Sequence, residues 1–337
     1  METNFNPITQ RRLRADKHIR ELTASVKLSY KSFIQPLFVD ESISESREVN
    51  GLNEILVETG ESVLTTIEQN LNNGITKFLL FPVPAHKKEK DFSTGPNGDF
   101  SFAAKTIKKI KETFAEDVWL ASDVCLCSYT THGHCGILNE DHSQLLNSKT
   151  VETLSQYAAL LANAGADCIA PSDMTDGRIG AIRNKLDALG YEQVSIMSYA
   201  AKFSSQWYGP FRDACHSAPN TKGLQNRKTY QLSPFNVNDA IASALRDEKE
   251  GADILMVKPA GLYTDVIVKL KQQTLKPIAA YHVSGEYAAI ESMAQQNLVN
   301  REAAHIETWA ALARAGADII ISYASKHAKQ WIEEIAY

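Results

Sequence analysis

Apolar runs alternate with helical patterns along most of this chain. Eight runs are almost continuously apolar, which predicts strands buried on both faces, as in a parallel sheet. They occupy residues 33–39, 77–83, 118–124, 167–172, 194–199, 253–258, 278–283 and 318–323. Apolar positions spaced as on one face of a helix predict helices between them. These helices are expected at residues 61–73, 100–114, 150–164, 177–189, 237–250, 263–273, 300–315 and 325–335, with an extra helical stretch near 285–296.

An eightfold alternation of strand and helix predicts a (β/α)₈ (TIM) barrel. A short repeat supports this fold, since Gly-Ala-Asp precedes a strand at 165–167, 251–253 and 316–318. A glycine just past a helix adopts the left-handed conformation without strain, so its repeated use predicts the same helix-to-strand joint each time. Asn73-Gly74 precedes the second strand in the same way. A doubly wound open sheet is the competing fold, but no G-x-G-x-x-G follows the first strand.

The first 32 residues lack a core pattern and are predicted to form an extended N-terminal arm, with the catalytic barrel at 33–337. The arm is basic, which fits either a solvated surface or a segment that packs on another subunit. Its basic residues are Arg11, Arg12, Arg14, Lys17 and Arg20. The start of the chain has no apolar segment of the kind that forms a secretory signal.

Composition narrows the class of protein. The 337 residues are 44% hydrophobic and 22% charged, which is typical of a globular enzyme. A net charge of −5 argues against a nucleic-acid partner. No apolar run approaches the ~18 residues of a membrane span. Five cysteines are too few and odd in number for a disulfide framework, so a reducing cytoplasm is expected.

The loop after the third predicted strand holds three of the five cysteines, Cys125, Cys127 and Cys135. Three thiolates so close together favour a zinc site, and three protein ligands leave the fourth position open, as in catalytic sites. Free cysteines can also be small buried hydrophobes, an interpretation that suits the other two cysteines better. His132 and His134 in the same loop could be ligands, donors to a ligand, or turn residues.

Two lysines stand where the active site of a barrel lies, at the C-terminal ends of strands. Lys258 ends the sixth strand, and Lys202 comes just after the fifth. Burial and mutual repulsion would lower their pKa values toward neutrality, where an amine can attack a carbonyl. A single lysine at a strand end often extends to solvent instead. Two on neighbouring strands, beside a thiolate metal site, favour Schiff-base chemistry.

A long loop, residues 203–236, follows Lys202 and is expected to form a lid or a binding element. It contains Arg212 and Arg227, and an arginine can bind a carboxylate through two parallel hydrogen bonds. Solvated surface arginines are the alternative.

These residues lie within longer motifs that together resemble one family. The motifs are SDVCLCSYTTHGHCG, APSDMTDGR, MSYAAKFSSQWYGPFRDA, LMVKPAGLYTD, YHVSGEY and RAGADIIISY. Over roughly residues 8–335 the chain resembles porphobilinogen synthase, also called 5-aminolevulinate dehydratase. The resemblance implies a (β/α)₈ barrel that condenses two molecules of 5-aminolevulinate into porphobilinogen with loss of two waters, in heme biosynthesis. It also implies a homo-octamer assembled through the N-terminal arm.

The resemblance further implies a role for each candidate residue. Lys258 would form a Schiff base with the first-bound substrate and Lys202 with the second, with Asp123 near the reacting amine. The three cysteines would bind the catalytic zinc. The implied substrate-binding residues are Arg212, Arg227 and Gln231 for the second carboxylate, Ser284 and Tyr323 for the first, and Ser172.

Three positions depart from the family pattern. Ser128 replaces the usual proline after the second cysteine, which removes no ligand. Ser243 stands where members with an allosteric magnesium carry Glu, and Thr229 where some relatives place a cysteine for a second zinc. Neither additional metal is therefore expected.

Two other functions compete with this one. A class I (lysine Schiff-base) aldolase on the same barrel has no need of three cysteines. A non-catalytic protein with a structural zinc would be expected to supply four ligands.

Overall fold

The computed structural model describes residues 10–85 and 99–334. Eight parallel strands pair with their neighbours, and pairing of β10 with β1 closes them into a barrel, which confirms the predicted fold. They are β1 (Phe33–Asp40), β4 (Lys77–Val83), β5 (Trp119–Val124), β6 (Cys168–Pro171), β7 (Ser195–Lys202), β8 (Ile254–Lys258), β9 (Ile278–His282) and β10 (Ile319–Ser322). Their side chains are almost all buried, as expected for strands covered on both faces.

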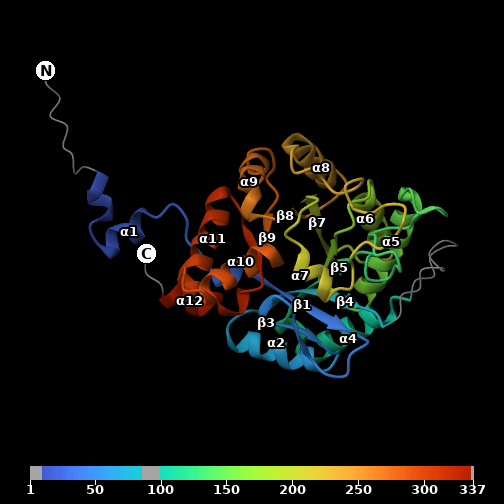
Figure 1. Cartoon of the computed structure of the whole chain (residues 1–337), viewed down its shortest axis with the longest axis horizontal. Coiled ribbons are helices and arrows are strands. Elements are labelled where there is room, and N and C mark those ends of the chain that lie inside the picture. Colours follow the sequence, from blue (N-terminus) through green and yellow to red (C-terminus); the bar gives the residue numbers. More distant parts are fainter. Residues whose placement is uncertain (1–9, 86–98, 335–337) are drawn as a thin grey trace, which may run out of the picture.

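Helices surround this barrel (Figure 1). The predicted ones are α2 (Ser62–Asn72), α4 (Ser101–Phe114), α5 (Asn147–Asn163), α6 (Arg178–Ala188), α8 (Val237–Lys249), α9 (Thr264–Lys271), α11 (Arg301–Ala315) and α12 (Ala328–Glu334). The extra helix is α10 (Ser284–Gln295). Short 3₁₀ turns are η1 (Gln10–Arg14), η2 (Tyr30–Ser32), η3 (Ala115–Asp117), η4 (Gly261–Tyr263) and η5 (Ser325–His327). Residue 335, the last of the predicted helix 325–335, lies outside the described residues.

Two insertions at the C-terminal end of the barrel were not predicted. A hairpin of β2 (Arg47–Val49) and β3 (Leu52–Glu58) follows β1, and β3 pairs in parallel with the end of β1. The short helix α7 (Gly209–Ala214) lies within the long loop after β7. β2 and α7, of three and six residues, are too short to show a clear period in the sequence. The seven residues of β3, LNEILVE, do not alternate strictly between apolar and polar positions.

The Gly-Ala-Asp repeat produces the same joint three times, as predicted. Each glycine has a positive φ, between 103° and 114°, and lies against the stem of a basic side chain from a neighbouring helix. The pairs are Gly165 with Lys111, Gly251 with Arg183, and Gly316 with Lys271. Each aspartate then accepts a hydrogen bond from the main chain of the preceding strand. The pairs are Asp167 with Leu120, Asp253 with Ile196, and Asp318 with Ile278. These joints hold the N-terminal end of the barrel, opposite the candidate site.

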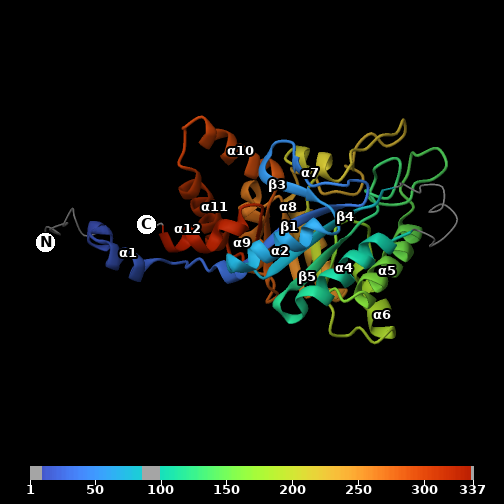
Figure 2. The ribbon, with the colours of Figure 1, turned by 90° about the horizontal axis from the view of Figure 1, so that it is seen from below.

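The described part of the N-terminal arm extends away from the barrel (Figures 1 and 2). Its helix α1 (Lys17–Thr23) buries none of its residues, and the Leu22 side chain is 78% exposed. Residues 1–9 of the predicted arm lie outside the described residues. None of the helices described here combines the length and apolar character needed to cross a membrane.

Candidate active site

The two candidate lysines are the last residues of neighbouring strands, and they lie opposite each other in the ladder. Lys202 of β7 is in register with Lys258 of β8. The expectation that Lys202 comes after its strand was wrong, because β7 continues to residue 202. Both side chains are buried, at 6% and 3% exposure. The structure therefore brings two amines together at the C-terminal end of the barrel, where barrel enzymes have their active sites.

Aromatic rings surround the amine of Lys258. Its Nζ lies 4.0 Å from the ring centre of Tyr281, 4.7 Å from Phe211 and 5.0 Å from Tyr199. Burial and the charge of Lys202 lower the pKa of Lys258 well below its usual value. Attraction of an ammonium to the rings opposes this shift, but the cost of burying the charge is larger. The neutral amine needed for nucleophilic attack is therefore favoured.

Asp123 and Ser172 lie beside the lysines. The Nζ of Lys202 donates a hydrogen bond of 2.5 Å to the main-chain oxygen of Ser172. Burial raises the pKa of Asp123 to about 6, although Lys202 and the Ser172 hydroxyl act to lower it. Its Oδ1 is buried without a hydrogen-bond partner. A carboxyl group with a pKa near neutrality can accept and return a proton.

The three loop cysteines form a compact buried group. Their Sγ atoms all lie within 4.8 Å of one another. The loop folds back at Gly133, which has a φ of 71°, and a Cβ there would lie 2.3 Å from the oxygen of Ala218. Only glycine fits this close approach. The structure thus gathers three thiols that are ten residues apart along the chain at most.

The donor set of this group fits a soft metal ion. Hydrogen bonds from Cys125 and Cys127 hold the pKa of Cys135 well below its ordinary value, whereas burial raises the pKa of Cys125. A tetrahedral zinc with Zn–S bonds of about 2.3 Å would separate its sulfurs by roughly 3.8 Å, which is within the observed spacing. The three-cysteine group is the candidate metal site found among residues 10–85 and 99–334.

The histidines of the loop have other partners. The Nδ1 of His134 lies 2.9 Å from the Tyr230 hydroxyl, and its Nε2 lies 2.7 Å from the oxygen of Leu224. Nδ1 of His132 accepts a hydrogen bond from the main-chain nitrogen of His134. The sequence left three roles open for these histidines. Because both ring nitrogens of His134 already have hydrogen-bond partners, His134 is better suited to supporting the loop than to binding a metal.

Arg227 connects the cysteine loop to the long loop after β7. Its guanidinium is buried, and Nη2 donates to the oxygens of Gly133 at 2.9 Å and Ser217 at 2.5 Å. Burial acts to lower the pKa of Arg227, but the neighbouring cysteines, above all Cys135, raise it overall and so keep the guanidinium charged. Its position places a fixed positive charge beside the candidate metal site.

Unpartnered polar atoms mark the space near Arg227. Both amide atoms of Gln231 are buried without a hydrogen-bond partner, and so is Nε of Arg212. Burial and the charge of Arg227 lower the pKa of Arg212. Buried polar groups are rarely left unpaired, so these atoms are suited to binding a polar ligand.

Ser284 and Tyr323 lie on the other side of Lys258. Ser284 begins α10, and its hydroxyl accepts from the main-chain nitrogen of Phe211 at 3.2 Å. The hydroxyl of Tyr323 lies 3.2 Å from that of Tyr281, the ring nearest to Lys258. The helix α7, which contains Phe211, is therefore attached to the same group of residues.

Comparisons with known proteins identify the family of this chain. The family profile described as delta-aminolevulinic acid dehydratase matches residues 8–331. The chain belongs to this family. A delta-aminolevulinic acid dehydratase of Helicobacter pylori is 41% identical over 321 residues, covering 95% of this chain and 96% of the relative. The Bacillus subtilis enzyme is 39% identical over 334 residues, covering 99% and 100%.

A solved structure shows the same fold in this family. Delta-aminolevulinic acid dehydratase (porphobilinogen synthase) from Toxoplasma gondii, in complex with the reaction product porphobilinogen, superposes with a TM-score of 0.89 at 36% identity. The superposition covers 96% of this chain and 92% of the Toxoplasma gondii chain. Membership of the dehydratase family confirms both the predicted family and the predicted class of enzyme, a lyase.

The structure also shows where the three residues that depart from the family pattern lie. Ser128 donates a hydrogen bond to the oxygen of Cys215, which anchors the cysteine loop. Ser243 donates to the oxygen of Ala200 in β7. Ser243 and Thr229 both line a cavity of about 760 Å³ beside α8, which neither lysine lines.

Two features of the site could not be predicted from the sequence. The aromatic rings nearest Lys258 come from β7, β9 and α7, and nothing in their spacing along the chain brings them together. Arg178 and Asp247, which form a buried ion pair close to β7, were also missed, although Arg178 lies in the motif APSDMTDGR.

Proposed function

We propose that this enzyme condenses two molecules of 5-aminolevulinate into porphobilinogen with loss of two waters, as a step of tetrapyrrole biosynthesis. The observation that carries the proposal is the register of Lys202 with Lys258 beside three clustered cysteines. Two identical keto acids need two carbonyl-binding groups within one site, and two facing amines supply them.

Lys258 would bind the first substrate. Its lowered pKa favours the neutral amine, which attacks the ketone carbon of 5-aminolevulinate. The carbonyl oxygen leaves as water, and a C=N bond to Nζ replaces the C=O bond. The resulting imine draws electrons from the adjacent carbon and so acidifies its hydrogens.

Lys202 would bind the second substrate in the same way. Its amine reaches the oxygen of Ser172, close to Asp123. The carbon acidified by one imine then attacks the other substrate, and the substrate amine closes the ring, which releases the lysines. Asp123, whose pKa is raised to about 6, would accept and return protons near this centre.

Zinc is the proposed cofactor, held by Cys125, Cys127 and Cys135. These soft, buried donors suit zinc, and three protein ligands leave one position for substrate. When bound, the ion would act as a Lewis acid toward the polar groups of the second substrate. The positive charge of Arg227 beside the cluster offsets the negative charge of three thiolates.

Two sets of residues would hold the carboxylates. Arg212, Arg227 and Gln231 would bind that of the second substrate, which is supported by the unpartnered atoms of these residues. Ser284 and Tyr323 would bind that of the first, since their hydroxyls lie near α7 and Tyr281. Fixing both carboxylates orients two identical molecules for one reaction among several.

We also propose that residues 1–32 act as an arm and that the barrel begins at residue 33. The exposed apolar side chains of the arm, such as Leu13 and Leu22, suit contact with another subunit in a homo-octamer. A cytoplasmic location is proposed from the free cysteines.

Borohydride reduction in the presence of 5-aminolevulinate tests the proposal. Reduction fixes an imine as a stable amine, and mass spectrometry after digestion identifies the modified lysine. The expected result is adducts at Lys202 and Lys258, together with a pyrrole product in unreduced samples. An enzyme that makes the pyrrole without either adduct, or makes none, would contradict it.

A further inference from the structure

The facing lysines depend on an irregularity in β7. Ser198 is in register with Leu255, but Ala201 is in register with Val257. Two residues of β7, Tyr199 and Ala200, therefore stand opposite a single residue of β8. This is a β-bulge. Without the extra residue, Ala201 would lie opposite Lys258.

A shift of one residue in a strand turns every later side chain to the other face of the sheet. The bulge is therefore what places the side chain of Lys202 on the same side of the barrel as that of Lys258. A bulge also removes main-chain groups from the ladder, and buried groups of this kind need other partners.

Side chains from two helices supply those partners. Nη2 of Arg178, from α6, donates to the oxygen of Tyr199 at 3.4 Å. The Ser243 hydroxyl, from α8, donates to the oxygen of Ala200 at 2.8 Å. Both oxygens belong to the two extra residues of the bulge.

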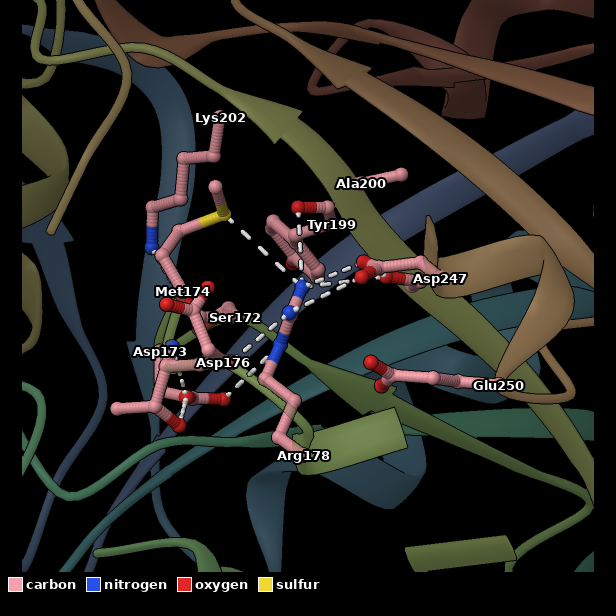
Figure 3. A network of polar contacts seen from close by, with 12 residues as sticks. Ser172, Asp173, Met174, Asp176, Arg178, Tyr199, Ala200, Lys202, Asp247 and Glu250 are labelled. Carbon is pink, nitrogen blue, oxygen red and sulfur yellow. Dashed lines mark hydrogen bonds and ion pairs between the residues drawn. The ribbon is translucent and has the colours of Figure 1, made fainter. Parts of the chain in front are cut away.

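A buried ion pair fixes Arg178 in this position (Figure 3). Arg178 is fully buried, and its Nη2 lies 2.9 Å from Oδ2 of Asp247. The same carboxylate oxygen accepts from the hydroxyl of Ser198 at 2.6 Å, at the start of the bulge. A buried ion pair stabilises a protein little more than apolar residues of the same volume would. Removing one partner is nevertheless strongly destabilising, because it leaves a buried charge without a counter-charge. Its geometry is therefore firmly held.

Arg178 also holds the segment that contacts the amine of Lys202. Its Nη1 donates to the oxygen of Thr175 at 3.2 Å, and its Nε lies 3.5 Å from Oδ2 of Asp173. The turn that begins with Ser172, whose oxygen accepts from Lys202, thus has the same support. One guanidinium fixes both the strand that carries Lys202 and the acceptor of its amine.

We propose that Arg178 and Ser243 are positioning residues for Lys202. They hold the bulge in β7, and so align the second amine without contacting substrate. The proposal rests on the proposed function, in which Lys202 forms an imine. It gives Ser243 a role in this chain at the position where some family members are expected to carry Glu.

Site-resolved trapping tests this assignment. Wild-type enzyme and Ser243→Ala are mixed with saturating 5-aminolevulinate, reduced with borohydride and digested, and the adducts on the two lysines are quantified. We expect the amount of Lys202 adduct to fall about tenfold relative to the Lys258 adduct. A change of this size is what the loss of one buried hydrogen bond typically causes. Ser243→Thr, which keeps the hydroxyl, should restore the ratio. Its extra methyl has room, because residue 243 lines a cavity.

Ser155→Ala is the matched control, since Ser155 is also a buried helical serine that donates to a main-chain oxygen, at 2.8 Å. It should leave the adduct ratio unchanged. Arg178→Lys, which keeps the charge but loses the double contact with Asp247, should lower the ratio further. If that variant does not fold, Ser243→Ala decides the question, because it leaves the ion pair intact.

An unchanged ratio in Ser243→Ala, or an equal fall at both lysines, would overturn the positioning role. Absence of both adducts from the wild-type enzyme would instead refute the proposed function. The two failures are therefore distinguishable.

Discussion

Lys202 and Lys258 lie opposite each other at the ends of neighbouring strands, and each carries its amine into the same buried space. Their proximity has an electrostatic consequence, because the charge of Lys202 adds to burial in lowering the pKa of Lys258. The pair is thus more than two separate nucleophiles. The charge on Lys202 favours the neutral form of Lys258.

Removing Lys202 should therefore raise the pKa of Lys258. In Lys202→Met, the pH at which imine formation at Lys258 is half-maximal should move upward, because a smaller fraction of the amine is neutral at a given pH. Borohydride trapping at Lys258 between pH 5 and 9 measures this midpoint. A midpoint at or below that of the wild type would show that the lysines are not coupled.

The two lysines should also react with 5-aminolevulinate in a fixed order. At limiting 5-aminolevulinate, the first adduct is expected on Lys258, whose neutral form is favoured. Lys258→Ala should abolish trapping and lower turnover at least about a thousandfold, as expected for a lost covalent nucleophile. Lys202→Ala should lose turnover but still trap one substrate. A first adduct on Lys202 would reverse the assigned roles.

Loss of one cysteine ligand should release zinc without unfolding the barrel. For Cys127→Ala we expect bound zinc to fall well below one ion per chain and activity to be largely lost, with an unchanged far-ultraviolet circular dichroism spectrum. Metal analysis by mass spectrometry provides the measurement. Cys168→Ala is the control, since Cys168 is buried in β6 outside the group. Full activity in protein shown to be free of zinc would refute the zinc assignment.

Arg212→Leu should weaken the binding of the second substrate. Losing a charge-assisted carboxylate contact typically costs about 2 kcal/mol or more, so KM should rise roughly thirtyfold or more, while imine formation at Lys258 keeps its rate. Steady-state kinetics and single-turnover trapping separate these effects. Arg314→Leu, on the exposed side of α11, is the control. An unchanged KM would place Arg212 outside the site.

Glu286 should make stability depend on pH. Its carboxylate accepts hydrogen bonds from Val283 and Gly261, yet burial raises its pKa to about 7. A raised pKa means that the folded state binds the proton more tightly. Its contribution, about 3 kcal/mol, is therefore complete below the ordinary pKa of 4.5 and is lost as the pH rises through 7.

Glu286→Gln resembles the protonated form and cannot titrate. Between pH 5 and 8, the melting temperature of the wild type should accordingly fall more than that of the variant. Thermal denaturation at several pH values gives the difference, in which the effects of other carboxylates cancel. Parallel curves for the two proteins would rule out this contribution.

Much of this enzyme follows from local sequence. Continuous apolar strands and the repeated Gly-Ala-Asp joints predict a closed parallel barrel, because each repeat adds one strand through the same helix-to-strand joint. Cys125, Cys127 and Cys135 lie close together along the chain, so their cluster could be predicted as well. The ends of strands likewise indicated both lysines, because parallel strands of a barrel bring their C-terminal ends to one side.

Tertiary structure alone decided how these groups are aligned. The bulge in β7 has no signal in the sequence, because its stability comes from Arg178 and Ser243, which lie on other elements. The rings around Lys258 likewise come from segments far apart in the chain. Local patterns report which face of an element is buried, whereas register and pKa depend on contacts between elements, which only the folded chain brings together.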